Sequence, residues 1–579
     1  MLSRGRNPRP TRKECYKNYL WLSIELRILV EFASILGYFE PYCEVQRVHS
    51  SETIEGERVM SFQSSSLNMT LGAMAIFAIT SFSAAENTIG IIQSCDPAEA
   101  CSDGYKLFAP LNGMQTFLID RDGMMINSWV DEYKVGNSVY LLEDGTLLRC
   151  TDNGPVDGGP AAGGDGGCAS IFDWDNNLLW RYCHNTLEYR LHHDIEPMPN
   201  GNILMISWEV KSNEEALAAG RDPSFIADED GEVWPLWIIE VEPDLSTADQ
   251  GTIVWEWRAW DHLVQDFDAT KANFGTVAAD PGKINLNYGR NGNADWLHCN
   301  AIDYNEELDQ ILISTPFLSE IWIIDHSMTT EEAATDAGDL LYRWGNSFAY
   351  DRGAEEDKEL WFPHDVRWVP AGYPGAGNIT VFNNGNGRPV GYSRADEIIP
   401  PLLADGSYDL AEGAAYGPDE ASIIYEAPNQ TDFYSSGLSG VERTPEGTTL
   451  ICMGRGSGTD PVGGQFFEVN ASGEVIWRYI NPVAPAGPLR QGDVPTGQNA
   501  FRCSHYPSNY AGLAEQDLTP QGPLELCRGD VNRDNAVDVN DLLLLLENFG
   551  SAGPDGDLDL DGDVDVDDLL VVIAQFGGC

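Results

Sequence analysis

Alternating apolar and polar positions recur along the chain from about residue 105. Short apolar runs reach a turn rich in Asp, Asn or Gly and return to an aromatic residue, as in FLIDRDGMMINSW, SIFDWDNNLLWRY and FFEVNASGEVIWRY. Period-two alternation around such turns predicts β-hairpins. Looser versions, in which longer insertions replace the tight turn, are IIEVEPDL with GTIVWEW and IWIIDHSM with GDLLYRW.

A second hairpin follows most of these first hairpins. The second hairpins are NSVYLLEDGTLLR, HHDIEPMPNGNILMI, HCNAIDYNEELDQILIS, HDVRWVPAGYPGAGNITVF and SGVERTPEGTTLICM. Two hairpins make a unit of four strands, and five or six such units predict an all-β fold, a β-propeller of about six blades. A large sandwich would not explain the recurring order of two hairpins.

A tryptophan ends each first hairpin of this pattern. We expect these side chains to serve blade packing, because large aromatic residues mostly belong to cores. They are Trp129, Trp180, Trp257, Trp344 and Trp477.

The run LGAMAIFAITSFSAA at residues 71–85 has the length and small-residue end of a secretory signal and is too short for an ordinary membrane span. We expect a signal peptide over residues 60–85, although its start lacks the usual positive charge. Residues 1–59 are then a mis-assigned or disordered N-terminal extension. This predicts a protein that is secreted, periplasmic or at the cell surface, with no membrane span.

Charge and cysteine content fit this picture. The formal net charge of −57 disfavours binding to nucleic acid, which requires clustered Lys and Arg. The cysteines after Ala85 are even in number, which in an exported chain predicts disulfides. Cys95 with Cys101, and Cys527 with Cys579, are the pairs to test first.

The C-terminal part repeats one short acidic motif after 27 residues. Its side chains fall at positions 1, 3, 5, 9 and 12 of a calcium-binding loop, and the carbonyls of Ala536 and Asp563 supply position 7. The predicted side-chain ligands are Asp530, Asn532, Asp534, Asp538 and Asp541 in the first copy, and Asp557, Asp559, Asp561, Asp565 and Asp568 in the second.

Each acidic loop runs into an apolar helix, DLLLLLENFG or DLLVVIAQFG. One loop with one helix, twice, is EF-hand-like but resembles a dockerin type I module more than an EF-hand pair. The resemblance covers residues 527–579 and implies Ca²⁺-dependent folding and docking to a cohesin-like partner. The expected domains are a β-propeller catalytic domain over 86–510, a linker over 511–526 and this dockerin-like, calcium-binding α-helical domain over 527–579.

Four of the nine histidines open a second hairpin. They are His192 and His193 in LHHDIEP, His298 in DWLHCNAIDY and His364 in FPHDVRW. If equivalent hairpins start at the same height in their blades, three blades deliver imidazoles to one central cleft. Such a ring suits either an open zinc or copper centre or nucleophilic and acid/base chemistry, and spacing alone leaves both open.

Residues 104–510 resemble the bacterial arylsulfate sulfotransferases, which are exported six-bladed propellers. The matching passages include GYKLFAPLNGMQTFLIDRDGMMINSW, LHHDIEPMPNGNIL, DWLHCNAIDY, FPHDVRWVPAGYPGAGNITVFNNGNGRP and NAFRCSHYPSNYAGL, with the HHD, HxN and HD motifs in family order. The resemblance implies transfer of a sulfuryl group from a phenolic sulfate donor to a phenol acceptor. It implies neither a nucleotide sulfate donor nor a cofactor for catalysis.

Carried over residue by residue, the resemblance makes His364 the nucleophile that becomes sulfohistidine. His298 and Asn300 would bind sulfate oxygens, and His298, His192 or His193 would protonate the leaving oxygen. Fixed donors would stabilise charge on the sulfuryl oxygens, as they do in phosphoryl transfer.

One departure concerns a family arginine, because Pro316 or Phe317 stands at its place. Arg388, Arg367 or Arg502 would have to substitute as the sulfate-binding cation. The alternatives are a non-catalytic binding propeller that the dockerin tethers to an extracellular scaffold, and a sulfatase-like hydrolase.

Overall fold

The computed structural model describes residues 87–577, except 227–230, 248, 291, 459, 535, 552–555 and 560–561. The chain divides into two units, Met1–Ser83 and Ala84–Cys579, and the described residues belong to the second. The expected extension over 1–59 and signal peptide over 60–85 therefore lie outside the described residues. No described helix is long and apolar enough to cross a membrane.

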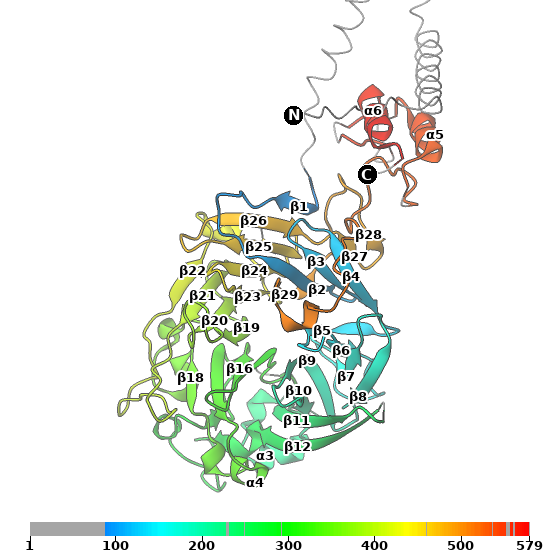
Figure 1. Ribbon diagram of the computed structural model, residues 1–579. Coiled ribbons are helices and arrows are strands. Elements are labelled where there is room, and N and C mark those ends of the chain that lie inside the picture. The colour runs from blue at the N-terminus through cyan, green and yellow to red at the C-terminus, as the bar shows by residue number, and fades with distance from the viewer. Residues whose placement is uncertain are drawn as a thin grey trace, which may run out of the picture. The chain divides into compact units, whose positions relative to one another are not determined.

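The described chain contains six antiparallel sheets of four or five strands (Figure 1). The first three sheets, each given from its innermost strand outward, are β29 (Ala500–Pro507), β2 (Gly104–Pro110), β3 (Gln115–Asp120), β4 (Met125–Val130); β5 (Lys134–Leu141), β6 (Leu147–Asp152), β7 (Gly167–Phe172), β8 (Leu178–Cys183); and β9 (Tyr189–Pro197), β10 (Ile203–Glu209), β11 (Leu236–Asp244), β12 (Gln250–Arg258).

The other three sheets continue the same order along the chain. They are β15 (Ala301–Asn305), β16 (Gln310–Thr315), β17 (Glu320–Asp325), β18 (Tyr342–Trp344); β19 (Pro363–Trp368), β20 (Ile379–Asn383), β21 (Arg394–Ile398), β22 (Ser422–Tyr425); and β23 (Gly440–Arg443), β24 (Thr449–Met453), β25 (Gln465–Val469), β26 (Val475–Ile480), with β1 (Gly90–Gln93) outside β26.

The innermost strands close into a ring. Each contacts the next, in the order β29, β5, β9, β15, β19 and β23, and β23 contacts β29 again. The fold is therefore a six-bladed β-propeller, as the hairpin pattern predicts. Closure joins distant parts of the sequence, because β29 near residue 500 pairs with β2 near residue 105 to complete one blade.

The predicted unit of two hairpins does not coincide with one blade, because it begins at the two outer strands of one blade and ends at the two inner strands of the next. FLIDRDGMMINSW forms β3 and β4, the outer strands of one blade, whereas NSVYLLEDGTLLR lies in β5 and β6, the inner strands of the next. Each second hairpin thus begins at an innermost strand, which places its first residues beside the axis.

The five repeated tryptophans lie on or next to the outermost strands and are buried. Each indole N–H donates to a backbone carbonyl of the neighbouring blade, at 2.7 to 2.9 Å: Trp129 to Asp173, Trp180 to Gln250, Trp257 to Gly338, Trp344 to Pro418 and Trp477 to Arg121. The predicted packing role is confirmed, and the indole also links adjacent blades by a hydrogen bond.

Short elements occupy the connections between strands. They include helices α3 (Asn213–Ala218) and α4 (Thr330–Ala333) and the small strand pairs β13 (Leu263–Val264) with β14 (Ile284–Asn285) and β27 (Val483–Ala484) with β28 (Gly487–Pro488). Cys95 is bonded to Cys101, as expected, and Cys168 to Cys183. Cys527 is also disulfide-bonded, and its expected partner Cys579 lies outside the described residues.

The segment 511–526, expected to be a linker, packs along the first blade. Leu513 is buried, Gln521 donates to the carbonyl of Ile126 at 2.7 Å, and the N–H of Met125 donates to Gly522 at 2.8 Å. Beyond it lie α5 (Val539–Asn548) and α6 (Val566–Gln575), which contact each other.

Candidate functional site

The four histidines singled out in the sequence lie in three consecutive blades. His192 and His193 belong to β9, His298 stands just before β15, and His364 belongs to β19. Strand pairing is irregular beside His192–His193 and again after His364. Such bulges re-aim side chains, and here they occur where the histidines leave the regular ladder.

The backbone at these positions is unusual for residues with a side chain. The φ angles are 54° at His193, 54° at His298, 59° at Phe362 and 49° at Asp365. A left-handed conformation at a non-glycine residue costs roughly 1–3 kcal/mol and is typical of functional sites. The three blades therefore carry the same kind of strained backbone in or just before their innermost strand.

The structure brings the imidazoles together at one place. Nδ1 of His192 lies 2.8 Å from Nδ1 of His193, and the ring centroids of His193 and His298 are 4.6 Å apart. Phe362 contacts both His298 and His364, with centroids 6.1 Å and 5.4 Å away. Phe501 lies in the same way between His193 and His364. We call His192, His193, His298 and His364 the histidine centre.

Asp295 organises one side of the histidine centre. Its carboxylate accepts a short hydrogen bond from Nδ1 of His298 and a bond of 3.0 Å from the indole of Trp208. That indole stacks on His192 at 4.2 Å. Contact with His298 helps to hold the pKa of Asp295 below its usual value although burial opposes this, so the carboxylate is charged.

Asn384 fixes the protonation of His364. Its amide nitrogen donates to the carbonyls of Ser435 and Leu438, at 2.8 Å and 2.9 Å. Its Oδ1 therefore faces Nδ1 of His364, 2.7 Å away, and must accept. The proton lies on Nδ1, and Nε2 carries the lone pair, which accepts the N–H of Leu438 at 3.1 Å.

Burial keeps most of the histidine centre neutral. It lowers the pKa of His364 and of His192 to about 3, and the pKa of His193 well below its usual value. A neutral imidazole is the form that attacks an electrophile or binds a metal.

A comparison with protein families identifies the activity. The model of the family described as Arylsulfotransferase (ASST) matches residues 176–478, just over half of the chain. The chain belongs to the arylsulfotransferase family. It is a sulfotransferase enzyme, with phenolic donors and acceptors as the family implies, and the match covers all four histidines of the centre.

The arylsulfotransferase chain is also similar to several solved structures, at low identity. For the periplasmic gluconolactonase PpgL of Pseudomonas aeruginosa the identity is 11% and the TM-score 0.33, over 66% of this chain and 84% of that one. For a calcium-binding regucalcin of Agrobacterium tumefaciens the values are 11% and 0.31, over 68% and 93%.

For dihydro-heme d1 dehydrogenase NirN the identity is 9% and the TM-score 0.27, over 69% of this chain. This chain spans only 60% of that one. No curated protein matches the chain. Similarity at this level carries no argument about what the arylsulfotransferase binds.

The aspartates that follow the histidines in the HHD and HD motifs of the arylsulfotransferase meet on one arginine. Arg502 contacts Asp194 at 2.9 Å, Asp365 at 2.7 Å and the hydroxyl of Tyr140 at 2.9 Å. Arg367 pairs with the same Asp365 at 2.9 Å. These contacts tie the strands of His193 and His364 to β29.

The other predicted substrate-binding residues, Asn300 and Arg388, are not part of the contacts around Arg502. Asn300 is buried; its amide donates to the carbonyl of Pro363 at 3.1 Å, and its oxygen accepts from Ser314. Asn300 therefore joins the HxN segment to the residue before His364. Arg388 lies over the ring of Tyr392 at 4.4 Å, and no contact recorded for the described residues joins it to the histidine centre.

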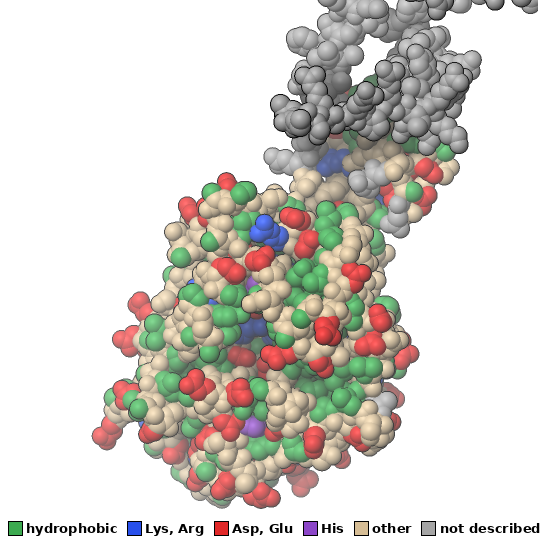
Figure 2. Space-filling view, in the orientation of Figure 1, with side chains coloured by type: hydrophobic (Ala, Val, Ile, Leu, Met, Phe, Trp, Pro, Cys, Tyr) green, Lys and Arg blue, Asp and Glu red, His purple; other side chains and the backbone are tan. Residues whose placement is uncertain are grey.

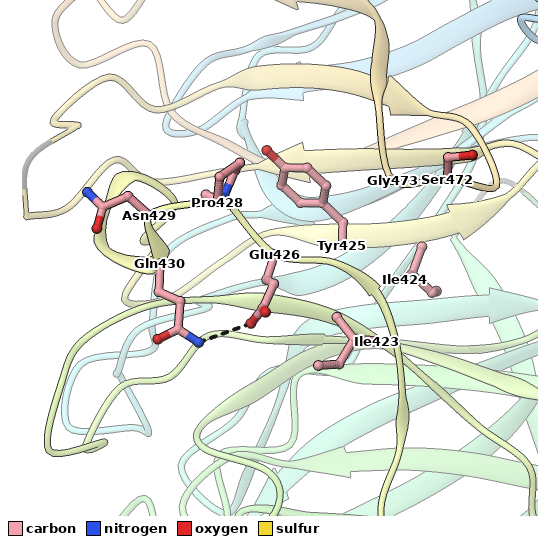
Figure 3. A pocket seen from close by; sticks show the side chains of 10 residues that line it. Ile423, Ile424, Tyr425, Glu426, Pro428, Asn429, Gln430, Ser472 and Gly473 are labelled. Atoms are coloured by element: carbon pink, nitrogen blue, oxygen red, sulfur yellow. Dashed lines mark hydrogen bonds between the residues drawn. The ribbon is translucent and has the colours of Figure 1, made fainter.

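Two cavities on the surface of the described propeller differ in their distance from the histidine centre. The one in Figure 3, of about 640 Å³, is lined by residues 423–430 with Ser472 and Gly473 and touches none of the four histidines. A cavity of about 520 Å³ is lined by Phe317 and Phe362, the rings that contact His298. We call it the aromatic cavity, and it is the one that adjoins the histidine centre.

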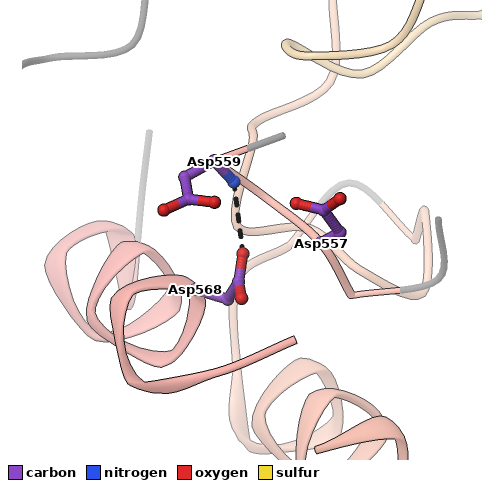
Figure 4. A group of neighbouring side chains, drawn as sticks. All are labelled: Asp557, Asp559 and Asp568. Carbon is purple, nitrogen blue, oxygen red and sulfur yellow. Dashed lines mark hydrogen bonds between the residues drawn. The ribbon is translucent and has the colours of Figure 1, made fainter. Parts of the chain in front are cut away.

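In the C-terminal part, the second acidic loop brings carboxylates together. Ligand atoms of Asp557, Asp559 and Asp568 all lie within 4.8 Å of one another (Figure 4). Asp568 is buried at the start of α6, and Asp541 is buried at the equivalent place in α5, where each completes a capping box. Of the predicted ligands, Asp561 lies outside the described residues.

Sequence reasoning missed Asp295, Trp208, Asn384 and Leu438. Asp295 stands three residues before His298, and Asn384 lies in the NNGNGRP passage that marks the family resemblance. These two positions are visible in the sequence, but nothing local assigns them a partner. Leu438 contributes only its backbone N–H, which no sequence pattern shows.

Proposed function

We propose that this protein transfers a sulfuryl group from a phenolic sulfate ester to a phenol through a sulfohistidine at Nε2 of His364. The observation that carries the proposal is the Asn384 contact, which places the proton of a buried, neutral imidazole on Nδ1 and the lone pair on Nε2. An imidazole prepared in this way is a nucleophile at neutral pH without a separate base.

In the first step, Nε2 of His364 attacks sulfur and the bond from sulfur to the phenolic oxygen breaks. The lone pair is engaged by the N–H of Leu438, so this hydrogen bond must break before the nitrogen can attack. Leu438 and Ser439 have φ angles of 64° and 91°, a strained backbone of the kind that clusters at active sites and switch regions. Once freed, the N–H is available to a sulfuryl oxygen.

His298 is suited to protonate the leaving oxygen. Its Nδ1 contacts Asp295, which stabilises the imidazolium, and its side chain is 11% exposed whereas His193 is almost fully buried. After the proton has moved to the phenolate, neutral His298 accepts a proton from the acceptor phenol. The phenol oxygen then attacks sulfur and releases His364.

The direct test is a mass shift of one sulfonate group on the His364 peptide after brief exposure to 4-nitrophenyl sulfate. His364→Ala should lose this label and the phenol-dependent release of nitrophenol while keeping the wild-type melting temperature. His326→Ala is the matched control, because His326 pairs with Asp309 and Glu240 outside the histidine centre. Full transfer by His364→Ala would rule out the mechanism.

We also propose that the protein is exported and that residues 527–579 bind Ca²⁺ and dock to a cohesin-like partner. The disulfides Cys95–Cys101 and Cys168–Cys183 favour an oxidising compartment. Three carboxylates within 4.8 Å repel one another unless a cation or protons neutralise them, which favours the metal.

Exposed apolar side chains support the docking role. They recur on α5 and α6 and just after them at a spacing of 27 residues: Val539 with Val566, Leu546 with Ile573 and Phe549 with Phe576. Calorimetric titration of the full chain with a type I cohesin module, with and without Ca²⁺, tests this proposal. Heat of binding that persists after chelation, or no binding in Ca²⁺, would count against it.

A further inference from the structure

The aromatic cavity adjoins the histidine centre through two of the phenylalanine rings that line it. Phe225, Tyr288, Phe317 and Phe362 all line it. The ring of Phe317 stacks on His298 with centroids 4.7 Å apart, and Phe362 lies 5.5 Å from Phe317. A planar guest in this cavity therefore lies against the rings that contact the histidines.

One cation lines the same cavity. The guanidinium carbon of Arg290 lies 4.4 Å from the centroid of Phe317, so a single ring separates Arg290 from stacking contact with His298. Among the described residues, no carboxylate pairs with Arg290, in contrast to Arg367 and Arg502, whose guanidinium groups already contact carboxylates.

We infer that Arg290 binds the sulfate group of an aryl sulfate donor as it enters, while Phe317 and Phe362 hold its aromatic ring. The inference rests on the proposed function and deepens it, because it names the residue that selects an anionic donor. Pro316 or Phe317 stands where the family resemblance leads one to expect an arginine, and Arg290 supplies a guanidinium on the face of Phe317 from a different segment.

The charge of the protein makes such a residue necessary. At a formal net charge of −57, the long-range field repels an anionic substrate. Acidic side chains are scattered over the visible face of the propeller, where basic ones are few (Figure 2). A guanidinium with no carboxylate partner among the described residues attracts the donor locally and can form two parallel hydrogen bonds to sulfate oxygens.

The experiment separates binding from turnover. In the full-length His364→Ala background, equilibrium dialysis measures the Kd of 4-nitrophenyl sulfate and of 4-nitrophenol, with and without Arg290→Ala. Loss of a charge-assisted contact should raise the Kd of the sulfate ester about tenfold or more and leave that of the phenol unchanged. The Kd of the sulfate ester for Arg290→Lys should lie between the values for the proteins with Arg290 and with Arg290→Ala.

Arg478→Ala is the matched control. Arg478 also lies over a phenylalanine, Phe467, but on the outer strand β26 of another blade. Phe317→Ala should weaken both ligands, because it removes the ring contact and not the charge.

An unchanged Kd for the sulfate ester in Arg290→Ala overturns the inference, and so does an equal loss for ester and phenol, which would mean packing alone. If wild-type protein shows no transfer but Arg290→Ala still weakens sulfate binding selectively, the proposed function fails and the Arg290 site stands. If transfer and labelling of His364 occur while Arg290→Ala binds normally, only the inference fails.

Discussion

Nδ1 of His364 lies 2.7 Å from Oδ1 of Asn384, whose amide nitrogen is committed to two backbone carbonyls. The orientation of this one amide determines which imidazole nitrogen carries the lone pair. Histidine chemistry in proteins commonly depends on such a partner at the other ring nitrogen.

Asn384→Asp should shift the pH profile of transfer. A carboxylate beside the imidazole favours its charged form, so the pKa of His364 rises from about 3 and the protonated, inactive fraction at a given pH grows. The acid limb of kcat/KM therefore moves to higher pH. Asn429→Asp, which adds the same charge on an exposed loop, should leave the limb in place. Identical profiles for all three proteins would contradict the assignment.

Asp295→Asn should slow transfer according to the leaving group. The amide still accepts from Trp208 but carries no charge to stabilise protonated His298. We expect a loss of roughly 10²–10⁴-fold for phenols of high pKa, which need a general acid, and a much smaller loss for 4-nitrophenyl sulfate. The slope of log kcat/KM against leaving-group pKa measures this. Asp249→Asn, at an exposed position, is the control, and a parallel shift of the line for Asp295→Asn would exclude a proton transfer by His298.

Glu442→Gln should become stabilising as pH rises. Burial raises the pKa of Glu442 to about 7, although Arg367 opposes this, whereas the unfolded carboxyl has a pKa of roughly 4.3. Between these values the folded chain binds more protons than the unfolded one, so this group makes stability fall as pH rises. Glutamine removes the titration.

Melting temperatures of wild type and Glu442→Gln, measured from about pH 3.5 to pH 8 so that the range begins below the unfolded pKa, provide the measurement for this prediction. The two proteins should melt alike at the acid end, and the variant should melt higher at the alkaline end. Glu426→Gln, in which a carboxylate on the surface cavity of Figure 3 is replaced, should follow wild type throughout. If Glu442→Gln became less stable relative to wild type as pH rises, the prediction would be contradicted.

Chelation of Ca²⁺ should unfold the C-terminal part and leave the propeller intact. Without a cation, the carboxylates of Asp557, Asp559 and Asp568 repel one another. Limited proteolysis should then cut within residues 527–579, while sulfotransferase activity remains. Asp568→Ala should show the same sensitivity in Ca²⁺, and Asp567→Asn, at an exposed neighbouring position, should not. Equal resistance with and without chelator would exclude a structural Ca²⁺.

Several features of the fold were within reach of the sequence because they depend on local chemistry. Alternation of apolar residues around Asp, Asn and Gly turns predicts hairpins, and their recurrence predicts closure into about six blades. The tryptophans at the hairpin ends are buried as expected, since large aromatic side chains mostly belong to cores. The capping pattern of Asp538 with Asp541 likewise marks the start of α5.

The sequence pattern does not show where one blade ends and the next begins. A repeat read along the chain has no privileged starting point, and only closure of β29 onto β2 shows that the predicted unit begins half a blade late. The segment 511–526 is expected to be a linker, yet Leu513 and Gln521 gain partners from a blade nearly 400 residues earlier in the sequence.

The sequence by itself determined that this is an all-β repeat protein in which histidines open equivalent hairpins, because period and turn chemistry are properties of neighbouring residues. Only the tertiary structure decided what those histidines meet. Asn384 beside His364, Asp295 beside His298 and Arg290 over Phe317 are contacts within or across blades that depend on bulges and left-handed backbone positions. Such contacts form only in the folded blades, and no local pattern encodes them.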